Sequence, residues 1–215
     1  MGVMVLRLQK IGLAPRIGPL LFCALVSLAS GCSQPAKLPP LPADAVVLAF
    51  GDSLTYGSGA NEAESYPAQL ARLTGRRVVR EGVPGEVSAA GLGRLPAALD
   101  EHRPRLLILC HGGNDLLRRL PKAQAAENVR AMIRLARERG IGVLLIGTPE
   151  IGFTLTPPEF YGEIAKQFSI PYEGDVLTKI LRNSELKSDQ VHPNAQGYRL
   201  MAERVADLLR KSGAI

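Results

Sequence analysis

Four short apolar runs follow one another along the chain after residue 45. They are Val46 to Phe50, Val78 to Val79, Leu106 to Cys110 and Val143 to Ile146. Consecutive apolar residues place side chains on both faces of a strand, which is the pattern of a parallel sheet covered by helices on both sides. We therefore interpret these four runs as buried strands.

Helical periodicity fills the segments between and after these runs. Apolar residues recur every three or four positions from Ala126 to Ala136, and this segment ends at Gly140. The C-terminal segment repeats the pattern, with an inner stripe formed by Tyr198, Met201, Val205, Leu208 and Leu209. Alternation of strands and helices with short connections predicts a doubly wound α/β sandwich, whose ligands bind beyond the carboxyl ends of the strands.

The chain before residue 45 has a different character. Residues 1–31 contain a basic stretch, an apolar run from about Ile17 to Ala29, and small residues before Cys32, an order typical of an export signal. The apolar run is short and is interrupted by Gly18 and Pro19, which argues against a permanent membrane span.

The sequence Leu28-Ala29-Ser30-Gly31-Cys32 resembles a bacterial lipobox. The resemblance implies lipid attachment at Cys32, so that the protein would be anchored to a membrane in the periplasm or cell envelope. Ala29 stands where Leu, Val or Ile is usual, and cleavage with release is the alternative. Residues 32–44 are rich in proline and predict a semi-rigid tether, followed by one folded domain at 45–215.

Charge and cysteine content narrow the function classes. The formal charge is +6, from 26 basic and 20 acidic residues, but three of the basic residues lie in the leader, which leaves 23 against 20, or +3. Basic residues are dispersed and aromatic residues are few, so nucleic acid is not an expected partner. With Cys23 in the leader and Cys32 lipidated, Cys110 has no disulfide partner and is interpreted as a core residue.

Two motifs supply candidates for nucleophilic catalysis. The first strand continues into Gly51-Asp52-Ser53-Leu54, where a tight turn would present the Ser53 hydroxyl. Near the C-terminus, Asp189 and His192 stand three residues apart, a spacing that lets a carboxylate orient one ring nitrogen while the other faces a serine. Taken alone, each motif is also typical of a turn or a helix cap without a catalytic role.

Two glycine-containing loops supply candidate donors for an oxyanion. Gly82-Val83-Pro84-Gly85-Glu86 follows the second predicted strand and offers the Gly85 N–H. His111-Gly112-Gly113-Asn114-Asp115 follows the third and offers the Asn114 amide. Because all these motifs lie just beyond predicted strands or in the last loop, we expect them to meet in one site.

Together these blocks resemble the GDSL family of the SGNH hydrolase superfamily, over nearly the whole of 45–215. The resemblance implies a three-layer α/β/α sandwich with a mostly parallel, flavodoxin-like sheet of about five strands. It also implies that Ser53 is the nucleophile, His192 the base and Asp189 its orienting acid. The oxyanion would be held by the Ser53 N–H, Gly85 and Asn114, and no metal or organic cofactor would take part.

The stretches around residues 65–70, 91–96 and 113–118 look most like the bacterial branch of arylesterases, lysophospholipases and acyl thioesterases. The expected substrates are therefore acyl esters or thioesters, with Leu116 and Leu117 lining the acyl site. A position in the core is the alternative for both leucines. The chain departs from the family where Glu81, Glu86-Val87 and His111 stand. We interpret His111 as a buried, hydrogen-bonded histidine.

Two other functions are compatible with these motifs. A carbohydrate O-deacetylase of the same superfamily would share the four blocks. A non-catalytic envelope lipoprotein would use the fold only for binding. An ordinary α/β-hydrolase is excluded, because no Gly-x-Ser-x-Gly elbow occurs in the chain.

Overall fold

The computed structural model describes residues 1–3, 36–152 and 154–215. The predicted Cys32 lipidation site, nearly all of the predicted export signal and the start of the predicted tether lie outside these residues. The chain divides into two units, Met1–Ser33 and Gln34–Ile215, and the helices and strands described below belong to the second. In the described part of the chain, no helix has the length and apolar character that crossing a membrane requires.

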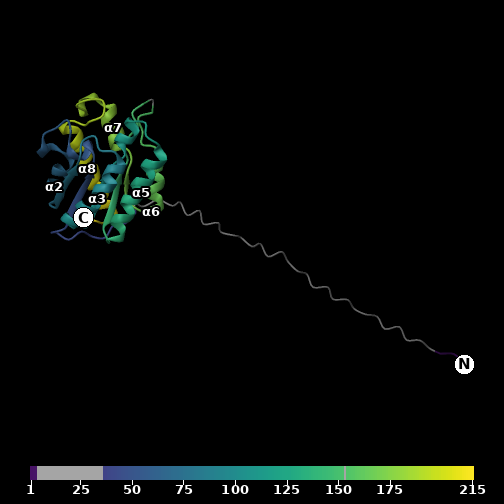
Figure 1. The fold of residues 1–215 in the computed structure, drawn as a ribbon. Helices are drawn as coiled ribbons and strands as arrows, with labels where there is room; N and C mark the ends of the chain where they lie inside the picture. The colour runs from purple at the N-terminus through teal and green to yellow at the C-terminus, as the bar shows by residue number, and fades with distance from the viewer. Residues whose placement is uncertain (4–35, 153) are drawn as a thin grey trace. The chain divides into compact units, whose positions relative to one another are not determined.

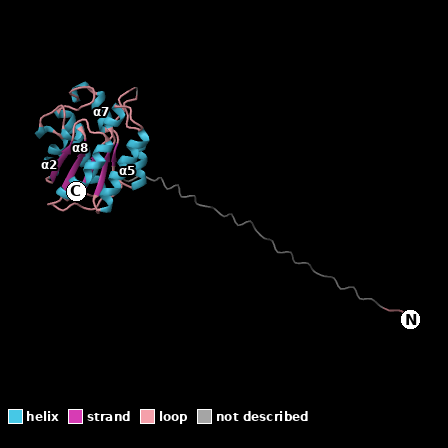
Figure 2. Ribbon diagram, viewed as in Figure 1, coloured by secondary structure: helices cyan, strands magenta, loops and turns pink. Residues whose placement is uncertain are grey.

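Five parallel strands form one sheet, in the order β2-β1-β3-β4-β5. Figure 2 shows the strands in magenta among the cyan helices. The strands are β1 (Val46–Gly51), β2 (Arg77–Gly82), β3 (Leu106–Cys110), β4 (Gly142–Ile146) and β5 (Tyr172–Glu173). The predicted α/β class and the parallel sheet of about five strands are confirmed. All four strands expected from the apolar runs are present.

Helices cover both faces of this sheet (Figure 1). One face carries α2 (Tyr66–Thr74), α7 (Val176–Arg182) and α8 (Ala195–Ser212), and the other carries α3 (Ser88–His102), α5 (Lys122–Glu138) and α6 (Glu159–Phe168). The short helices α1 (Ser53–Tyr56) and α4 (Gly113–Leu117) and two 3₁₀ turns, η1 (Glu62–Glu64) and η2 (Ser184–Leu186), complete the domain.

Alternating side chains of each central strand belong to two separate hydrophobic clusters. In β1, Val47 and Ala49 pack toward α2 and α8, whereas Leu48 and Phe50 pack toward α3 and α5. Both sets are buried because helices cover both sides. This explains why the strand sequences are apolar at consecutive positions instead of alternating with polar residues.

The segment 36–44, which the sequence predicted as part of a tether, packs against the domain. Leu38 is buried, and its backbone N–H donates to the Ser212 carbonyl at 2.9 Å. The Leu41 N–H donates to the Ala214 carbonyl at 2.8 Å. These contacts attach the segment to the end of α8.

The carboxyl ends of β1, β2 and β3 lie side by side, because the strands are parallel and adjacent. Gly51 pairs in register with Gly82 on one side and with Cys110 on the other. Helix α1 begins two residues after Gly51, and α4 begins three residues after Cys110. The three sequence blocks that follow these strands are therefore brought to one edge of the sheet.

Candidate active site

Ser53 is held at the first position of α1 by a tight turn at the end of β1. A Cβ atom added to Gly51 would lie 2.0 Å from the Cys110 carbonyl oxygen and 2.5 Å from Thr55 Oγ1, so only glycine fits there. Asp52 caps α1, and its Oδ1 accepts the Leu54 N–H at 3.0 Å. The turn thus presents the Ser53 side chain beyond the sheet.

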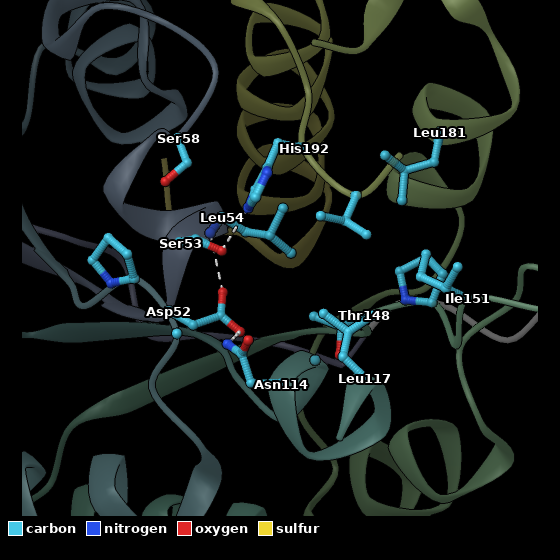
Figure 3. A pocket seen from close by; sticks show the side chains of 15 residues that line it. Asp52, Ser53, Leu54, Ser58, Asn114, Leu117, Thr148, Ile151, Leu181 and His192 are labelled. Atoms are coloured by element: carbon cyan, nitrogen blue, oxygen red, sulfur yellow. Dashed lines mark hydrogen bonds between the residues drawn. The ribbon is translucent and has the colours of Figure 1, made fainter. Parts of the chain in front are cut away.

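His192 lies within hydrogen-bonding distance of Ser53. The distance from His192 Nε2 to Ser53 Oγ is 2.9 Å (Figure 3). The distance from His192 Nδ1 to Asp189 Oδ2 is 2.7 Å. An ionised carboxylate only accepts hydrogen bonds, so this contact places the ring proton on Nδ1 and leaves Nε2 free to accept the serine proton. The three side chains form a hydrogen-bonded chain in the order that nucleophilic catalysis requires.

The loop between η2 and α8 holds the imidazole in this orientation. Asp189 Oδ1 accepts the backbone N–H groups of Val191 and His192, both at 2.8 Å, and the Ser188 N–H donates to the His192 carbonyl at 2.9 Å. Partial burial raises the pKa of the Asp189 carboxyl, but hydrogen bonds from the His192 ring and from these N–H groups outweigh burial and lower it below its usual value. Asp189 is therefore held ionised.

Asn114, on α4, points toward the end of β1. Its Nδ2 donates to Asp52 Oδ2 at 3.2 Å and to the Glu86 carbonyl at 3.0 Å. Gly85, in the loop after β2, has a φ of +77°, a backbone conformation that favours glycine. Ser53, Gly85 and Asn114 all line the same cavity. The residues predicted as oxyanion donors are thus brought together.

Asp52 is a site residue that the sequence indicated only as part of a turn. Its side chain is buried at the base of the site, between the Leu54 N–H and the Asn114 amide (Figure 3). Burial raises the pKa of this carboxyl, and the hydrogen bond from the Leu54 N–H offsets the rise only in part. The sequence feature that could have indicated Asp52 as a site residue is its position directly before the candidate nucleophile.

A cavity of about 240 Å³ opens beside the serine. Leu117 lines it and is 47% exposed, whereas Leu116 is buried at 7% exposure and does not line it. The sequence did not indicate three further lining residues, Thr148, Ile151 and Leu181. Thr148 and Ile151 follow β4, and their place after the fourth predicted strand is the sequence feature that could have indicated them as site residues. The remaining lining residues are Asp52, Leu54, Ser58, Pro84, Gly113, Pro149, Val191 and His192.

The histidine at position 111 is not one of the residues that line the cavity. It is fully buried, and its Nε2 lies 3.1 Å from Glu86 Oε2. Within the described residues, no group of three or more His, Cys, Asp or Glu side chains is arranged to hold a metal ion. The polar side chains that line the cavity with Ser53 are the His192 imidazole, the Asn114 amide, the Asp52 carboxyl and the hydroxyls of Ser58 and Thr148.

A doubly wound α/β/α sandwich with a Ser–His–Asp chain at the carboxyl ends of its strands defines the class of the protein as a serine hydrolase. Comparisons with known proteins give the family. The model of the GDSL-like lipase/acylhydrolase family matches residues 49–200. The chain belongs to this family.

Relatives with known names agree with this assignment. The chain is 35% identical over 150 residues to the esterase TesA of Pseudomonas aeruginosa, covering 67% of this chain and 72% of that protein. It is 28% identical over 172 residues to thioesterase 1/protease 1/lysophospholipase L1 of Escherichia coli K12, covering 76% and 83%. A crystal structure of TesA superposes with a TM-score of 0.68 at 29% identity, covering 77% and 98%. The protein is a carboxylic ester hydrolase.

Proposed function

We propose that Ser53 is the nucleophile of this hydrolase, that His192 is its general base and that Asp189 orients His192. The observation that carries the proposal is the 2.9 Å distance between Ser53 Oγ and His192 Nε2 at the wall of a cavity. The Asp189 contact with Nδ1 supports it, because it fixes the tautomer that can accept the hydroxyl proton.

In the proposed cycle, Ser53 Oγ attacks the acyl carbon while His192 Nε2 takes the hydroxyl proton. The tetrahedral intermediate collapses when the bond to the alcohol or thiol breaks, and His192 donates the proton to that leaving group. An acyl-enzyme remains. His192 then takes a proton from water, whose oxygen attacks the acyl carbon, and the proton passes to Ser53 as the acid leaves.

The negative charge of each intermediate would be held by the backbone N–H groups of Ser53 and Gly85 and by the Asn114 side chain. Their common position on the cavity wall supports this role. Both Nδ2 hydrogens of Asn114 already have acceptors, Asp52 and the Glu86 carbonyl. Donation to an oxyanion therefore requires Asn114 to share or exchange one of these bonds as charge develops.

The substrates we propose are esters or thioesters of medium-length or longer acyl chains. The cavity beside Ser53 has an apolar wall, which includes Leu117, Ile151 and Leu181. An acyl chain placed there removes apolar surface from water, at about 25 cal/mol per Å². The names esterase, thioesterase and lysophospholipase among the relatives support this class over a carbohydrate O-deacetylase.

Two measurements on the purified protein test the proposal. A fluorophosphonate probe should label the wild type and fail to label Ser53→Ala, and loss of labelling should accompany loss of esterase activity. p-Nitrophenyl octanoate should be cleaved with a kcat/KM at least equal to that of the acetate. Absence of labelling of folded wild type would indicate a non-catalytic protein, and activity restricted to acetate would indicate a deacetylase.

We further propose that residues 1–31 are an export signal, that Cys32 carries lipid and that the protein is held at a membrane of the cell envelope. The lipobox-like sequence supports this. Because Leu38 is already fixed to the domain, the tether would be short, close to residues 33–37. Detergent-phase partitioning of the wild type, lost in Cys32→Ser, tests the anchor, while partitioning of both into water would indicate a released form.

A further inference from the structure

The side chain of His111 connects the two loops that carry the proposed oxyanion donors. Its Nδ1 accepts the Gly112 N–H at 3.0 Å, two residues before Asn114. Its Nε2 lies 3.1 Å from the Oε2 of Glu86, the residue that follows Gly85. One buried ring thus contacts the loop after β2 and the loop after β3.

These contacts define the protonation of the ring. A backbone N–H is only a donor, so Nδ1 of His111 must be unprotonated to accept it. Nε2 then carries the hydrogen and donates it to the Glu86 carboxylate. His111 is therefore a neutral donor, and this separates it from the base role that we propose for His192.

Glu86 is fixed at several points besides His111. Its carboxylate receives two hydrogen bonds from Arg94, from Nε at 3.0 Å and from Nη2 at 2.9 Å, and its side chain is only 8% exposed. Its carbonyl accepts the Asn114 amide at 3.0 Å. A two-pronged contact with arginine has a defined geometry, so the position of Glu86 also fixes the backbone of the adjacent Gly85.

The neighbouring helix is shaped to accommodate this ring. A Cβ atom added to Gly91, on α3, would lie 2.1 Å from His111 Nε2. The Tyr161 hydroxyl donates to the His111 carbonyl at 2.8 Å, and the Phe50 ring lies 6.0 Å from the imidazole. The histidine occupies a closely packed site in which its two hydrogen bonds are its only polar side-chain contacts among the described residues.

We propose that His111 and Glu86 are positioning residues that hold the Gly85 N–H and the Asn114 amide at the separation an oxyanion requires. The inference rests on the proposed function and adds a second group of residues to it. Neither side chain lines the cavity beside Ser53. Their effect passes through Glu86 to Gly85, and through Gly112 to Asn114.

The test compares His111→Leu with His111→Gln in the full protein. Leucine removes both hydrogen bonds, whereas the glutamine amide can still donate to Glu86. With p-nitrophenyl octanoate, we expect kcat of the leucine variant to fall about 10- to 100-fold with little change in KM, because misplaced donors weaken transition-state binding selectively. The glutamine variant should recover a substantial part of the lost kcat.

An alkylboronic acid gives a second readout, since its tetrahedral adduct on serine places an oxygen in the oxyanion site. Its inhibition constant should rise in proportion to the loss of kcat/KM across the variants. A role confined to packing would lower thermal stability without producing this proportionality.

The chain offers a matched control. His102 Nε2 contacts Glu81 Oε1 at 3.0 Å, and Glu81, like Glu86, binds Arg94. His102 is the last residue of α3, far along the helix from Gly91, which packs against His111. His102→Leu should therefore leave kcat and the boronic acid constant within about twofold of the wild type.

Three results would overturn the inference: a folded His111→Leu with unchanged kcat, a loss confined to KM, or an equal loss in His102→Leu. If His111→Leu does not fold, Glu86→Gln replaces it, and an unchanged kcat there has the same meaning. Failure of the proposed function gives a different result, because fluorophosphonate would then not label the wild type at all.

Discussion

Asn114 donates its side-chain N–H to the buried carboxylate of Asp52 at 3.2 Å, and Asp52 directly precedes Ser53. The same carboxylate accepts the Leu54 N–H and so caps α1. Asp52 thereby joins the helix that presents the proposed nucleophile to the helix that presents a proposed oxyanion donor. The position of the amide relative to Ser53 therefore depends on this side chain as well as on the Glu86 carbonyl.

Asp52→Asn should separate this function from stability. The asparagine oxygen still accepts the Leu54 N–H, but its amide group then faces the Asn114 amide, so one donor opposes another. We expect kcat to fall about 10- to 100-fold. The melting temperature should change little, because burial already raises the pKa of Asp52 and a neutral side chain relieves that cost. Steady-state kinetics and circular dichroism test this, and unchanged kcat would contradict it.

Asp189→Asn should be more harmful than Asp189→Ala. The Asp189 side chain is 52% exposed, so in the alanine variant water replaces it beside His192. An asparagine amide would instead donate to Nδ1 and leave the ring proton on Nε2, where it opposes the Ser53 hydroxyl. We expect kcat of the asparagine variant to be at least about 10-fold below that of the alanine variant. The reverse order in steady-state assays would show that Asp189 does not set the tautomer.

The sequence predicted the central strands because burial on both faces requires uninterrupted apolar residues there. Strand β5 was not predicted, since it has only two residues, Tyr172 and Glu173, and one of them is acidic. Glu173 is buried, and the hydrogen bonds that its Oε1 accepts from the N–H groups of Asp175 and Val176 at the start of α7 compensate for its burial. A buried helix cap of this kind has no signature in apolar patterning.

The site shows a similar division. Ser53, His192 and Asn114 follow strands or precede the last helix within recognisable blocks, and the fold brings them to one place. Leu181 lines the same cavity from α7, where nothing in the local sequence marks it, and Ile151 is indicated only by its place after β4. Cavity walls depend on packing between distant segments, which periodicity does not describe.

Leu117→Ala and Leu116→Ala should have different effects although the two residues are adjacent. Leu117 lines the cavity, so its truncation should raise KM for p-nitrophenyl octanoate and leave the acetate nearly unchanged. Leu116 is buried, so its truncation should lower the free energy of unfolding by about 2–4 kcal/mol without changing the octanoate-to-acetate ratio. Kinetics with p-nitrophenyl esters of increasing chain length and urea unfolding test the two variants. A chain-length profile of Leu117→Ala equal to that of the wild type would show that Leu117 does not contact the acyl chain.

Glu86 should make the folded state sensitive to acid. Burial raises the pKa of this carboxyl, but hydrogen bonds from His111 and Arg94 and the charge of Arg94 outweigh burial and lower the pKa from 4.5 to about 2. A carboxyl with a lowered folded-state pKa stabilises the protein above its unfolded pKa, and this stabilisation is lost as the pH falls through the folded value.

The free energy of unfolding should therefore depend less on pH in Glu86→Gln than in the wild type between pH 4.5 and about 2, the interval between the two pKa values. Urea unfolding at several pH values in this interval measures the difference. If the free energy of unfolding changed with pH by the same amount in both proteins, Glu86 would not be ionised and paired as the structure indicates.

Leu38→Ala should destabilise the domain although Leu38 lies before the first strand. The leucine packs into the hydrophobic cluster between the sheet and helices α2, α7 and α8, and its N–H donates to the Ser212 carbonyl at the end of α8. We expect the free energy of unfolding to fall by about 2 kcal/mol, the low end for a buried leucine, because the site is next to solvent. Lys37→Ala, at an exposed neighbour, is the control and should have an effect below about 0.5 kcal/mol. Equal stability of all three proteins in urea would mean that the segment 36–44 is not part of the folded domain in solution, and the tether would then extend to Asp44 as the sequence alone suggested.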